Sequence, residues 1–554
     1  MGRSQNPDLA RFTTGAVDQT NEHHKLTMIK ESQLELRSEA SNIGGSPDPR
    51  EGIRWSDVAL LGIAASFSPL DMMSNNVLAI AHPDRVLALI AVVWAASVAV
   101  ALGLVRRGVR RTTAVFSTFF VISMVMAGGG VLRLLGQPIG WLAILGLVGS
   151  ITLLIARSDK HQILRPIMVV ISAFLVAGPL LSFVDDLGGV GLNIANAPQA
   201  SGLALTSTPD VFLVVLDGYV GLETLARDFG FEEPAIVDAL EDRGFEVPRS
   251  AWSSFPSTRA SVPSLLDMSY PLEPGDGITP ATDLHLSEVI GGNNSLNTIL
   301  ESAGYESVMV ESGWSGSFCG GQVDRCVTAP FLDEMMFSVL ERTLAGPTVL
   351  ESFGYSFTVG AQRTMTWLAE NAPQLSVDDV PSFVFTHIMA PHPPFFLDQQ
   401  CQTVYSDSMS GVSFARASDD MASRRGAYLA QASCLNDFMV DLSDRLDPDD
   451  VVVFVADHGS DGRNQLIRDP ASWTDEDLVE RYNVFLAVRD GKGCSVGSPV
   501  VLPNIFRRVL SCLSEEKLPD LAPRMLKYAA SSFKGRPSPI LEVSREDLSA
   551  LLDS

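Results

Sequence analysis

The chain has 554 residues, of which 46% are hydrophobic and 19% charged, and its net charge is −25. This hydrophobic content excludes a chain that is disordered throughout, and the excess of Asp and Glu argues against a nucleic-acid-binding protein. The hydrophobic residues form long runs before residue 185 and short runs after it. This division predicts a membrane-embedded first part and a water-exposed second part.

Residues 1–54 show neither hydrophobic periodicity nor a signal-peptide pattern, so we expect a disordered cytoplasmic tail. Residues 55–184 contain five apolar runs, each of about the length that crosses a bilayer as a helix. We therefore predict a transmembrane domain of five helices. The runs lie near residues 58–80, 86–105, 114–132, 139–156 and 166–184.

Lys and Arg cluster in two loops between these runs, and the positive-inside rule assigns both loops to the cytoplasm. With a cytoplasmic N-terminus and five crossings, the chain after residue 185 is predicted to be extracytoplasmic. The first run is the weakest, because it contains Pro69 and Asp71. If one run is instead a re-entrant or buried helix, the second part faces the cytoplasm. The basic residues are Arg106, Arg107, Arg110 and Arg111 in one loop, and Arg157, Lys160 and Arg165 in the other.

All six cysteines follow residue 318. Disulfides persist outside the cytosol, so this distribution agrees with an extracytoplasmic second part. Among the possible connectivities we expect neighbours along the chain to pair, and the alternative is six buried thiols. The expected pairs are Cys319 with Cys326, Cys401 with Cys434, and Cys494 with Cys512.

After a linker over residues 185–208, residues 209–534 alternate short Val, Ile and Phe runs with longer amphipathic stretches. This alternation predicts an α/β domain around a mostly parallel central sheet. A helix is expected over residues 295–303, and residues 535–554 are expected to be a C-terminal tail with a short helix. The predicted strands cover residues 210–216, 307–311, 383–387 and 451–456.

Acidic and imidazole side chains follow three of these strands. Asp217 ends the first, Asp457 and His458 end the last, and His387 ends the third, with His392 shortly after it. Ligands of open α/β sheets bind beyond the carboxyl ends of the strands, so these side chains are expected at one edge. A carboxylate and an imidazole directly after an apolar strand are costly unless they bind a metal or form hydrogen bonds. For Asp217 alone, an ordinary turn is the alternative.

A hydroxyl-rich loop over residues 253–264 leads into an apolar helix start. Its Ser and Thr side chains are suited to cap the helix N-terminus. A helix N-terminus also stabilises anions, so a hydroxyl held there beside a cation is suited to attack a phosphate. Arg259 is expected to contact a phosphate through its guanidinium, although solvation at the helix start is the alternative.

These motifs, in this order and downstream of the apolar runs, resemble the alkaline phosphatase/sulfatase superfamily. More narrowly, they are similar to its membrane-anchored branch of lipoteichoic acid synthases and phosphoethanolamine transferases. The resemblance covers about residues 209–515 and implies a sulfatase-like catalytic domain. The motifs are Asp217-Gly218, the loop around Thr258, the segment with His387 and His392, and Asp457-His458-Gly459.

The stretch from Thr258 to Pro263 is similar to the Thr-x-x-Ser-Val-Pro stretch of phosphoethanolamine transferases, which implies that Thr258 is the nucleophile. The resemblance also implies one bound Zn²⁺ or Mn²⁺. It implies that His387 and His392 contact the phosphoryl group or the leaving oxygen. The implied metal ligands are Asp217, Thr258, Asp457 and His458.

The chain departs from that family at two positions. The transferases have Glu where this chain has Asp217, and phosphoethanolamine transferases have a further His after Asp-His-Gly, whereas His458 is the last histidine here. The Cys/Ser-x-Pro/Ala-x-Arg motif of sulfatases proper is absent around Arg259, which argues against sulfate-ester chemistry.

The expected reaction is a two-step transfer of a phosphoryl-linked group. Thr258 attacks a lipid or lipid-linked phosphodiester donor, His392 or His387 protonates the leaving alcohol, and a phospho-threonine intermediate passes its group on. The acceptor is expected to be a hydroxyl of a cell-envelope glycan or lipid. The short linker keeps the site near the bilayer, which favours a lipid-linked donor.

Three alternatives remain at this point. A phosphodiesterase or phosphatase of the same fold would use the same residues with water as the acceptor. A non-catalytic envelope protein would keep the fold as a binding module. Within the loop, Ser257 and Ser261 are rival nucleophiles to Thr258.

Overall fold

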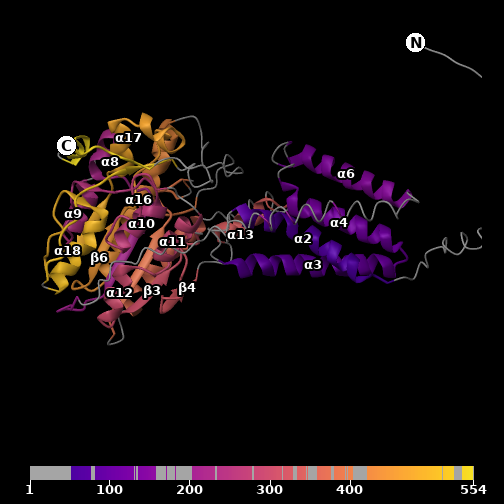
Figure 1. Cartoon of the computed structure of the whole chain (residues 1–554), viewed down its shortest axis with the longest axis horizontal. Helices are drawn as coiled ribbons and strands as arrows, with labels where there is room; N and C mark the ends of the chain where they lie inside the picture. The colour runs from indigo at the N-terminus through magenta and orange to yellow at the C-terminus, as the bar shows by residue number, and fades with distance from the viewer. Residues whose placement is uncertain are drawn as a thin grey trace, which may run out of the picture.

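The computed structural model consists of a helical part and an α/β part (Figure 1). Apart from a few single residues, it describes residues 52–75, 82–129, 137–157, 203–230, 234–276, 280–314, 316–328, 333–344, 358–375, 380–393, 397–403, 421–514, 516–529 and 540–552.

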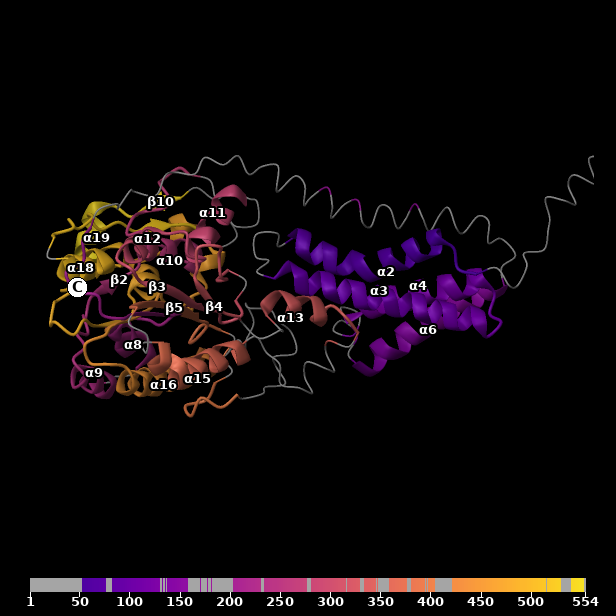
Figure 2. The same cartoon turned by 90° about the horizontal axis from the view of Figure 1, so that it is seen from below.

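The helical part contains α2 (Trp55–Asn75), α3 (Pro83–Arg106), α4 (Arg111–Ala127) and α6 (Gln137–Arg157). These helices lie side by side, with α2 packed on α3 and α4, and α4 packed on α6 (Figure 2). Their mutual packing is apolar, as at Leu61, Ala101 and Phe116.

Among the described residues, one helix, α3, is long and apolar enough to cross a membrane. α4 and the segment Leu142–Ile151 are apolar but shorter. α2 carries Pro69 inside the helix, together with two aspartates, which lowers its hydrophobicity. The prediction of five spans is therefore not confirmed. The fifth predicted run, residues 166–184, lies outside the described residues except for single positions.

The α/β part is built on a six-stranded sheet with the order β4-β3-β5-β1-β6-β7. All neighbours are parallel except β6 and β7, so the prediction of a mostly parallel sheet is confirmed. β3 begins at Glu306, one residue earlier than predicted, because Glu306 is in register with Ser382. The strands are β1 (Val211–Leu216), β3 (Glu306–Val310), β4 (Arg325–Val327), β5 (Ser382–Ile388), β6 (Val451–Val455) and β7 (Leu486–Arg489).

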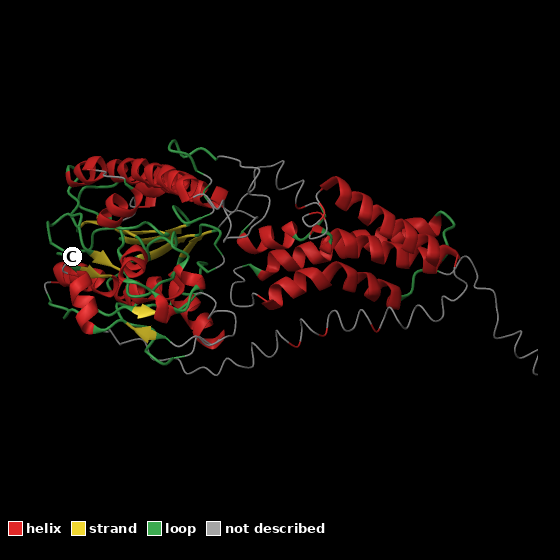
Figure 3. Cartoon of the chain, turned by 90° about the horizontal axis from the view of Figure 1, so that it is seen from above, coloured by secondary structure: helices red, strands yellow, loops and turns green. Residues whose placement is uncertain are grey.

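Helices cover both faces of the sheet (Figure 3). One group packs around α10 (Thr258–Leu266) and contains α11 (Pro280–Ile290), α12 (Ser295–Ser302) and α18 (Leu502–Ser514). The other contains α9 (Pro234–Glu241), α15 (Thr358–Leu375) and α16 (Met421–Arg445). α12 is the helix predicted over residues 295–303. β1, β5 and β6 are buried along their whole length, as expected for strands covered on both faces.

The C-terminal residues pack onto the α/β part. β10 (Leu541–Glu542) pairs with β9 (Leu526–Lys527), and α19 (Arg545–Leu552) follows. Leu548 and Leu551 of α19 contact the same apolar cluster as Trp473 and Tyr482. The segment expected to be a tail thus adds to the hydrophobic packing near α17 (Asp475–Tyr482).

A short helix, α13 (Glu334–Glu341), packs against α2 and α3 and links the two parts of the molecule. Asp333 caps this helix through the N–H of Met336 and pairs with Arg85 of α3 at 3.1 Å. Glu311, at the end of β3, lies 3.0 Å from His82. The contact between the two parts therefore includes ion pairs as well as apolar packing.

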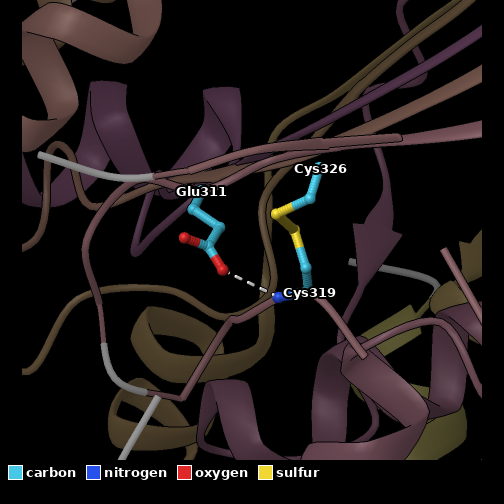
Figure 4. Close-up of side chains that lie close together, drawn as sticks. All are labelled: Glu311, Cys319 and Cys326. Carbon is cyan, nitrogen blue, oxygen red and sulfur yellow. Dashed lines mark hydrogen bonds between the residues drawn. A yellow bond between two sulfur atoms is a disulfide. The ribbon is translucent and has the colours of Figure 1, made fainter. Parts of the chain in front are cut away.

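Three disulfides are present, and they join the pairs expected from the sequence. Cys319–Cys326 closes a loop next to Glu311, whose carboxylate accepts a hydrogen bond from the backbone N–H of Cys319 at 2.9 Å (Figure 4). Cys401–Cys434 ties the segment after β5 to α16, and Cys494–Cys512 ties the segment after β7 to α18.

Candidate active site

The candidate site lies where three neighbouring strands end. Asp217 follows β1, Asp457 and His458 lie just beyond β6, and His387 is the next-to-last residue of β5. Because β1 pairs in parallel with both β5 and β6, these ends meet at one edge of the sheet. All four residues are at least 98% buried. The structure thus brings together side chains as far apart in the chain as Asp217 and His458.

Asp217, Asp457 and His458 form a compact group whose potential ligand atoms lie within 4.8 Å of one another. Nε2 of His458 is 3.2 Å from Oδ2 of Asp457 and 3.4 Å from Oδ1 of Asp217. His387 completes the group from the side of β5, with Nε2 3.4 Å from Oδ2 of Asp217. The other oxygen of Asp457, Oδ1, accepts the backbone N–H groups of Gly218 and His458, which fixes this carboxylate.

The hydrogen bonding of His458 sets the chemistry of the group. Its Nδ1 lies 2.9 Å from the carbonyl oxygen of Gly459, so Nδ1 carries the proton and donates it. Burial lowers the pKa of His458 to about 4, so the ring is neutral at pH 7. Nε2 therefore directs a lone pair at two carboxylates. Burial opposes ionisation of Asp217, but the charge of His392 and the contact with His387 outweigh it and hold the pKa of Asp217 well below its usual value.

Within the described residues, Oδ1 of Asp217, Oδ2 of Asp457 and both ring nitrogens of His387 are buried without a hydrogen-bond partner. Such groups are costly to bury unless a cation or a donor satisfies them. Two carboxylate oxygens and an imidazole lone pair are ligands that suit Zn²⁺ or Mn²⁺. The residues present therefore fit a divalent metal ion.

Two other groups of acidic and sulfur side chains do not offer thiolate ligands. In the group of Glu311, Cys319 and Cys326, both cysteines form a disulfide (Figure 4). The same holds for Cys494 and Cys512 beside Asp490. Among the described residues, the cluster at the sheet edge is thus the one whose ligand atoms are free to bind a metal.

Thr258 is the first residue of α10, and its Oγ1 lies 3.2 Å from Nε2 of His458. Because this nitrogen is unprotonated, the Thr258 hydroxyl donates to it. The rival hydroxyls point elsewhere: Ser257 Oγ bonds to the hydroxyl of Tyr528 at 2.9 Å, and Ser261 Oγ donates to the carbonyl of Phe255 at 2.9 Å. Of the three candidates, Thr258 is the one whose hydroxyl contacts the group of Asp217, Asp457 and His458.

The two predicted histidines occupy different environments. The side chain of His387 has no exposed surface, and its ring lies 5.0 Å from the ring of Trp314. His392 is half-buried, and its backbone N–H donates to the carbonyl of Asp217 at 2.9 Å. Its Nδ1 donates to the carbonyl of Pro393 at 2.5 Å. His392, but not His387, lines the cavity described below.

Arg259, predicted to contact a phosphate, is held by α11. Its Nη1 donates to Oγ of Ser287 at 2.6 Å and lies 3.3 Å from Oδ1 of Asp283. Its guanidinium also lies over the ring of Trp314, 5.5 Å from the ring centroid. The structure does not bring Arg259 into contact with the carboxylate and imidazole group.

Arg481, at the end of α17, is a functional candidate that the sequence analysis missed. Its side chain is buried, its Nε donates to the carbonyl of Pro256 at 2.6 Å, and its Nη1 donates to the carbonyl of Gly459 at 2.8 Å. It thus joins the loop before Thr258 to the turn after Asp457. No motif surrounds Arg481 in the sequence, so only the fold reveals this contact.

A cavity of about 440 Å³ opens beside the site. Gly218, His392 and Gly459 lie in its wall. Gly218 follows Asp217 and Gly459 follows His458 in the chain, and the backbone N–H of His392 donates to the carbonyl of Asp217. The cavity gives space for a ligand next to the buried group.

The sequence model of the family described as Sulfatase matches residues 218–482. No curated protein matches the chain. Among solved structures, the chain is similar to the C-terminal periplasmic domain of EcEptC from Escherichia coli in complex with Zn. The identity is 12% over 56% of this chain and 83% of that chain, with a TM-score of 0.36.

Two further similar structures come from Neisseria meningitidis. The soluble domain of lipooligosaccharide phosphoethanolamine transferase A is 14% identical over 57% of this chain and 92% of that chain, with a TM-score of 0.37. The integral membrane protein lipooligosaccharide phosphoethanolamine transferase A is 13% identical over 82% of this chain and 95% of that chain, with a TM-score of 0.36.

Proposed function

Starting from the membership of residues 218–482 in the sulfatase/alkaline phosphatase superfamily, we propose that this chain is a membrane-anchored, metal-dependent enzyme that transfers a phosphoryl-linked group through Thr258. One observation carries the proposal. The Thr258 hydroxyl, at the N-terminus of α10, lies 3.2 Å from Nε2 of His458, within a buried group that contains Asp217 and Asp457. A nucleophile, a cation site and an anion-stabilising helix end thus coincide.

The residues that would hold the metal are Asp217, Asp457 and His458, with Thr258 as the fourth. All four offer oxygen or nitrogen atoms that face one another. A divalent cation bound there would lower the pKa of the Thr258 hydroxyl and neutralise charge on the phosphoryl oxygens. The carboxylates and the neutral imidazole leave the choice between Zn²⁺ and Mn²⁺ open.

The residues of the chain account for the bond changes. With a cation bound, Thr258 would lose its hydroxyl proton to solvent before the first step. Its Oγ1 then forms a bond to phosphorus, the bond between phosphorus and the leaving oxygen breaks, and the N–H at Nε2 of His392 supplies the proton that this oxygen takes up. N–H groups of the first turn of α10 stabilise the negative charge of the phosphoryl group. In the second step, Nε2 of His392 accepts a proton from the acceptor hydroxyl, whose oxygen attacks phosphorus. The bond between phosphorus and Oγ1 breaks, and Thr258 leaves as the alkoxide.

The donor is proposed to be a membrane lipid or lipid-linked phosphodiester, and the acceptor a hydroxyl of an envelope glycan or lipid. α3 supports membrane anchorage, and ion pairs hold the α/β part against α2 and α3. The three disulfides support an extracytoplasmic location of the catalytic domain. Multiple membrane crossings and a cytoplasmic N-terminus are part of this proposal.

Hydrolysis is the second candidate function. His392 lies in the wall of a cavity, where water can reach it as readily as an acceptor hydroxyl can. If water takes the second step, the same residues give a phosphodiesterase or phosphatase. The product, rather than the first step, distinguishes the two functions.

The test is the intact mass of the purified full-length protein after incubation with Zn²⁺ or Mn²⁺ and an envelope lipid extract. We expect an adduct on the wild type and none on Thr258→Ala, while Ser257→Ala, whose hydroxyl faces Tyr528, keeps the adduct. The added mass identifies the group carried. An adduct that persists on Thr258→Ala would overturn the nucleophile assignment, and free product without an adduct would favour rapid hydrolysis.

A further inference from the structure

Several side chains that line the cavity beside the candidate site have no role in the proposed transfer reaction. The cavity has a volume of about 440 Å³ and meets the reacting groups at Gly218, His392 and Gly459. A ligand whose phosphorus lies at Thr258 therefore extends into this cavity. The inference below rests on the proposed function and concerns which part of the substrate fills this space.

One wall of the cavity is aromatic. Tyr428 stacks on Phe229 with ring centroids 4.5 Å apart, and Phe395 meets Tyr428 edge to face at 6.2 Å. The hydroxyl of Tyr428 donates to the carbonyl of Gly218 at 3.0 Å, which ties this wall to the end of β1. Ile467, which also lines the cavity, is 73% exposed. The wall offers an apolar surface to rings or acyl carbons.

The carboxylates in the lining already have partners. Arg463 lies 3.5 Å from Asp228 and 3.4 Å from Glu480. Asp461 accepts the backbone N–H of Leu466 at 3.1 Å. Asp228 also accepts two hydrogen bonds from Arg227, so Arg227 and Arg463 together balance the charges of Asp228 and Glu480. These two acids therefore leave little charge to attract a cationic ligand.

Two arginines of the lining differ from Arg463. Arg424 and Arg425 lie on α16, and Arg424 is one helical turn before Tyr428. Neither forms an ion pair or hydrogen bond with any residue in the described part of the chain. Arg424 is half-buried and Arg425 is exposed. Guanidinium groups at the edge of an aromatic wall favour a ligand that is both apolar and anionic.

We propose that this cavity is a subsite for a second anionic group of the substrate, a phosphate or a carboxylate, linked to the reacting phosphorus through a ring or other apolar spacer. Arg424 and Arg425 bind the anion, and the wall of Phe229, Phe395 and Tyr428 packs against the spacer. The subsite therefore selects substrates with this second anionic group over substrates that carry only the reacting phosphoryl group.

The test compares three probes by calorimetry on the Zn²⁺-loaded full-length protein in detergent: benzylphosphonate, 4-carboxybenzylphosphonate and 4-(phosphonomethyl)benzylphosphonate. In the wild type, we expect at least one of the doubly anionic probes to bind about tenfold more tightly than benzylphosphonate. Whichever gains more identifies carboxylate or phosphate as the second group. In the Arg424→Gln/Arg425→Gln variant, the ratio of Kd values falls to about one.

Arg445→Gln is the matched control, because Arg445 lies on the same helix, 21 positions after Arg424, and pairs with Asp441. At 1.5 Å per residue it is about 30 Å from Arg424, so the Kd ratio stays at the wild-type value. A second anionic group that brings no gain in the wild type, or a gain that survives in the double variant, overturns the subsite and leaves the proposed function standing. Failure of all probes to bind overturns the subsite and the phosphoryl site together.

Calorimetry needs no turnover, so the subsite is tested independently of the transfer reaction. If the doubly anionic probes bind with the expected ratio but Thr258 carries no adduct in the mass experiment, the subsite stands and the transfer function fails.

Discussion

The guanidinium of Arg481 donates a hydrogen bond to the carbonyl oxygen of Gly459 at 2.8 Å. That carbonyl also accepts the Nδ1 proton of His458, so Arg481 helps to fix the tautomer that turns the lone pair of Nε2 toward the carboxylates. Its second bond, to Pro256 at 2.6 Å, holds the loop that leads to Thr258. One buried side chain therefore sets the distance between the proposed nucleophile and the proposed metal ligands.

Replacing Arg481 with Lys is expected to lower kcat about 100-fold, because a single ammonium cannot hold both carbonyls in place and small displacements of reacting groups are costly. Zn²⁺ affinity is expected to fall about tenfold, as for other residues that orient a metal ligand. Both are measured on the full-length protein, by turnover and by competition with a chelator. Arg468→Lys, a change in the ion pair with Asp477 in the first turn of α17, is the control. Unchanged Zn²⁺ affinity in Arg481→Lys would leave this residue a purely structural role.

Metal binding and apo stability are expected to change in opposite directions in Asp457→Asn. The Asn side chain keeps an oxygen to accept the N–H groups of Gly218 and His458, but it removes the charge that faces Nε2 of His458 and Asp217. We expect the metal-free variant to melt at least as high as the metal-free wild type, because a buried unpaired charge is lost.

Zn²⁺ is expected to raise the Tm of the wild type by several degrees, because it binds the native state and not the unfolded chain. The rise is expected to be much smaller in Asp457→Asn, because this variant lacks one of the proposed ligands. Differential scanning calorimetry and elemental analysis measure the two effects. Asp441→Asn, at an exposed ion pair on α16, serves as the control and is expected to keep the Zn²⁺ response. Stoichiometric Zn²⁺ in Asp457→Asn would contradict the ligand assignment.

The central strands were predictable because β1, β5 and β6 are covered on both faces and therefore read as nearly unbroken apolar runs. Their parallel pairing then brings Asp217 and Asp457 together, as the strand-end rule predicts. β7 was not predicted, because its four residues carry no pattern beyond that of a short apolar run. The pairing of β7 with β6 depends on tertiary packing alone.

Side-chain partners were the part that the sequence could not predict. Arg259 lies next to Thr258 in the chain, yet its guanidinium turns to Asp283 and Ser287 on α11. Arg481 has no neighbouring motif, yet it contacts both loops of the site. In the helical part, the lengths of the apolar runs in the sequence did not distinguish α3 from its neighbours. α3 is long and apolar enough to cross a membrane, whereas the other described helices are shorter or more polar.

The stability of the protein is expected to depend on pH through Asp450, which precedes β6. Burial and the neighbouring charge of Asp210 raise the pKa of Asp450 from 3.8 to about 7. Since the folded state holds this proton more tightly than the unfolded state does, stability from this group is present at pH 4 and is lost as the pH rises to about 7. Above pH 7 the loss is complete.

Asp450→Asn should therefore match the wild-type Tm at pH 4 and exceed it at pH 8. We expect a difference of about 2–4 °C, the shift that about 1 kcal/mol gives after allowance for solvent screening. The Asn oxygen can still accept the N–H of Asp447, so this bond is kept. The control is Asp449→Asn, at the adjacent exposed position. Its Tm is expected to differ from that of the wild type by the same amount at both pH values. A Tm difference that is the same at both pH values would contradict the raised pKa.

The ion pair between Arg85 of α3 and Asp333 at the start of α13 is expected to hold the two parts of the molecule together. Its side chains are only 10% and 2% exposed, so removal of one partner leaves a poorly solvated charge. Asp333→Asn keeps an oxygen to cap the N–H of Met336 while losing the charge. We expect Arg85→Gln and Asp333→Asn each to lower the Tm of the full-length protein by about 3–8 °C.

The double variant distinguishes direct pairing from two separate effects. If the two charges stabilise the contact only through each other, Arg85→Gln/Asp333→Asn melts no lower than the worse single variant, because no unpaired charge remains. The pair of Arg342 with Asp71, whose side chains are 36% and 47% exposed, is the matched control at the same contact. Arg342→Gln is expected to change the Tm by no more than about 1 °C, since exposed ion pairs contribute little. Additive losses in the double variant would show that Arg85 and Asp333 act through different partners and that this pair does not hold α13 on α3.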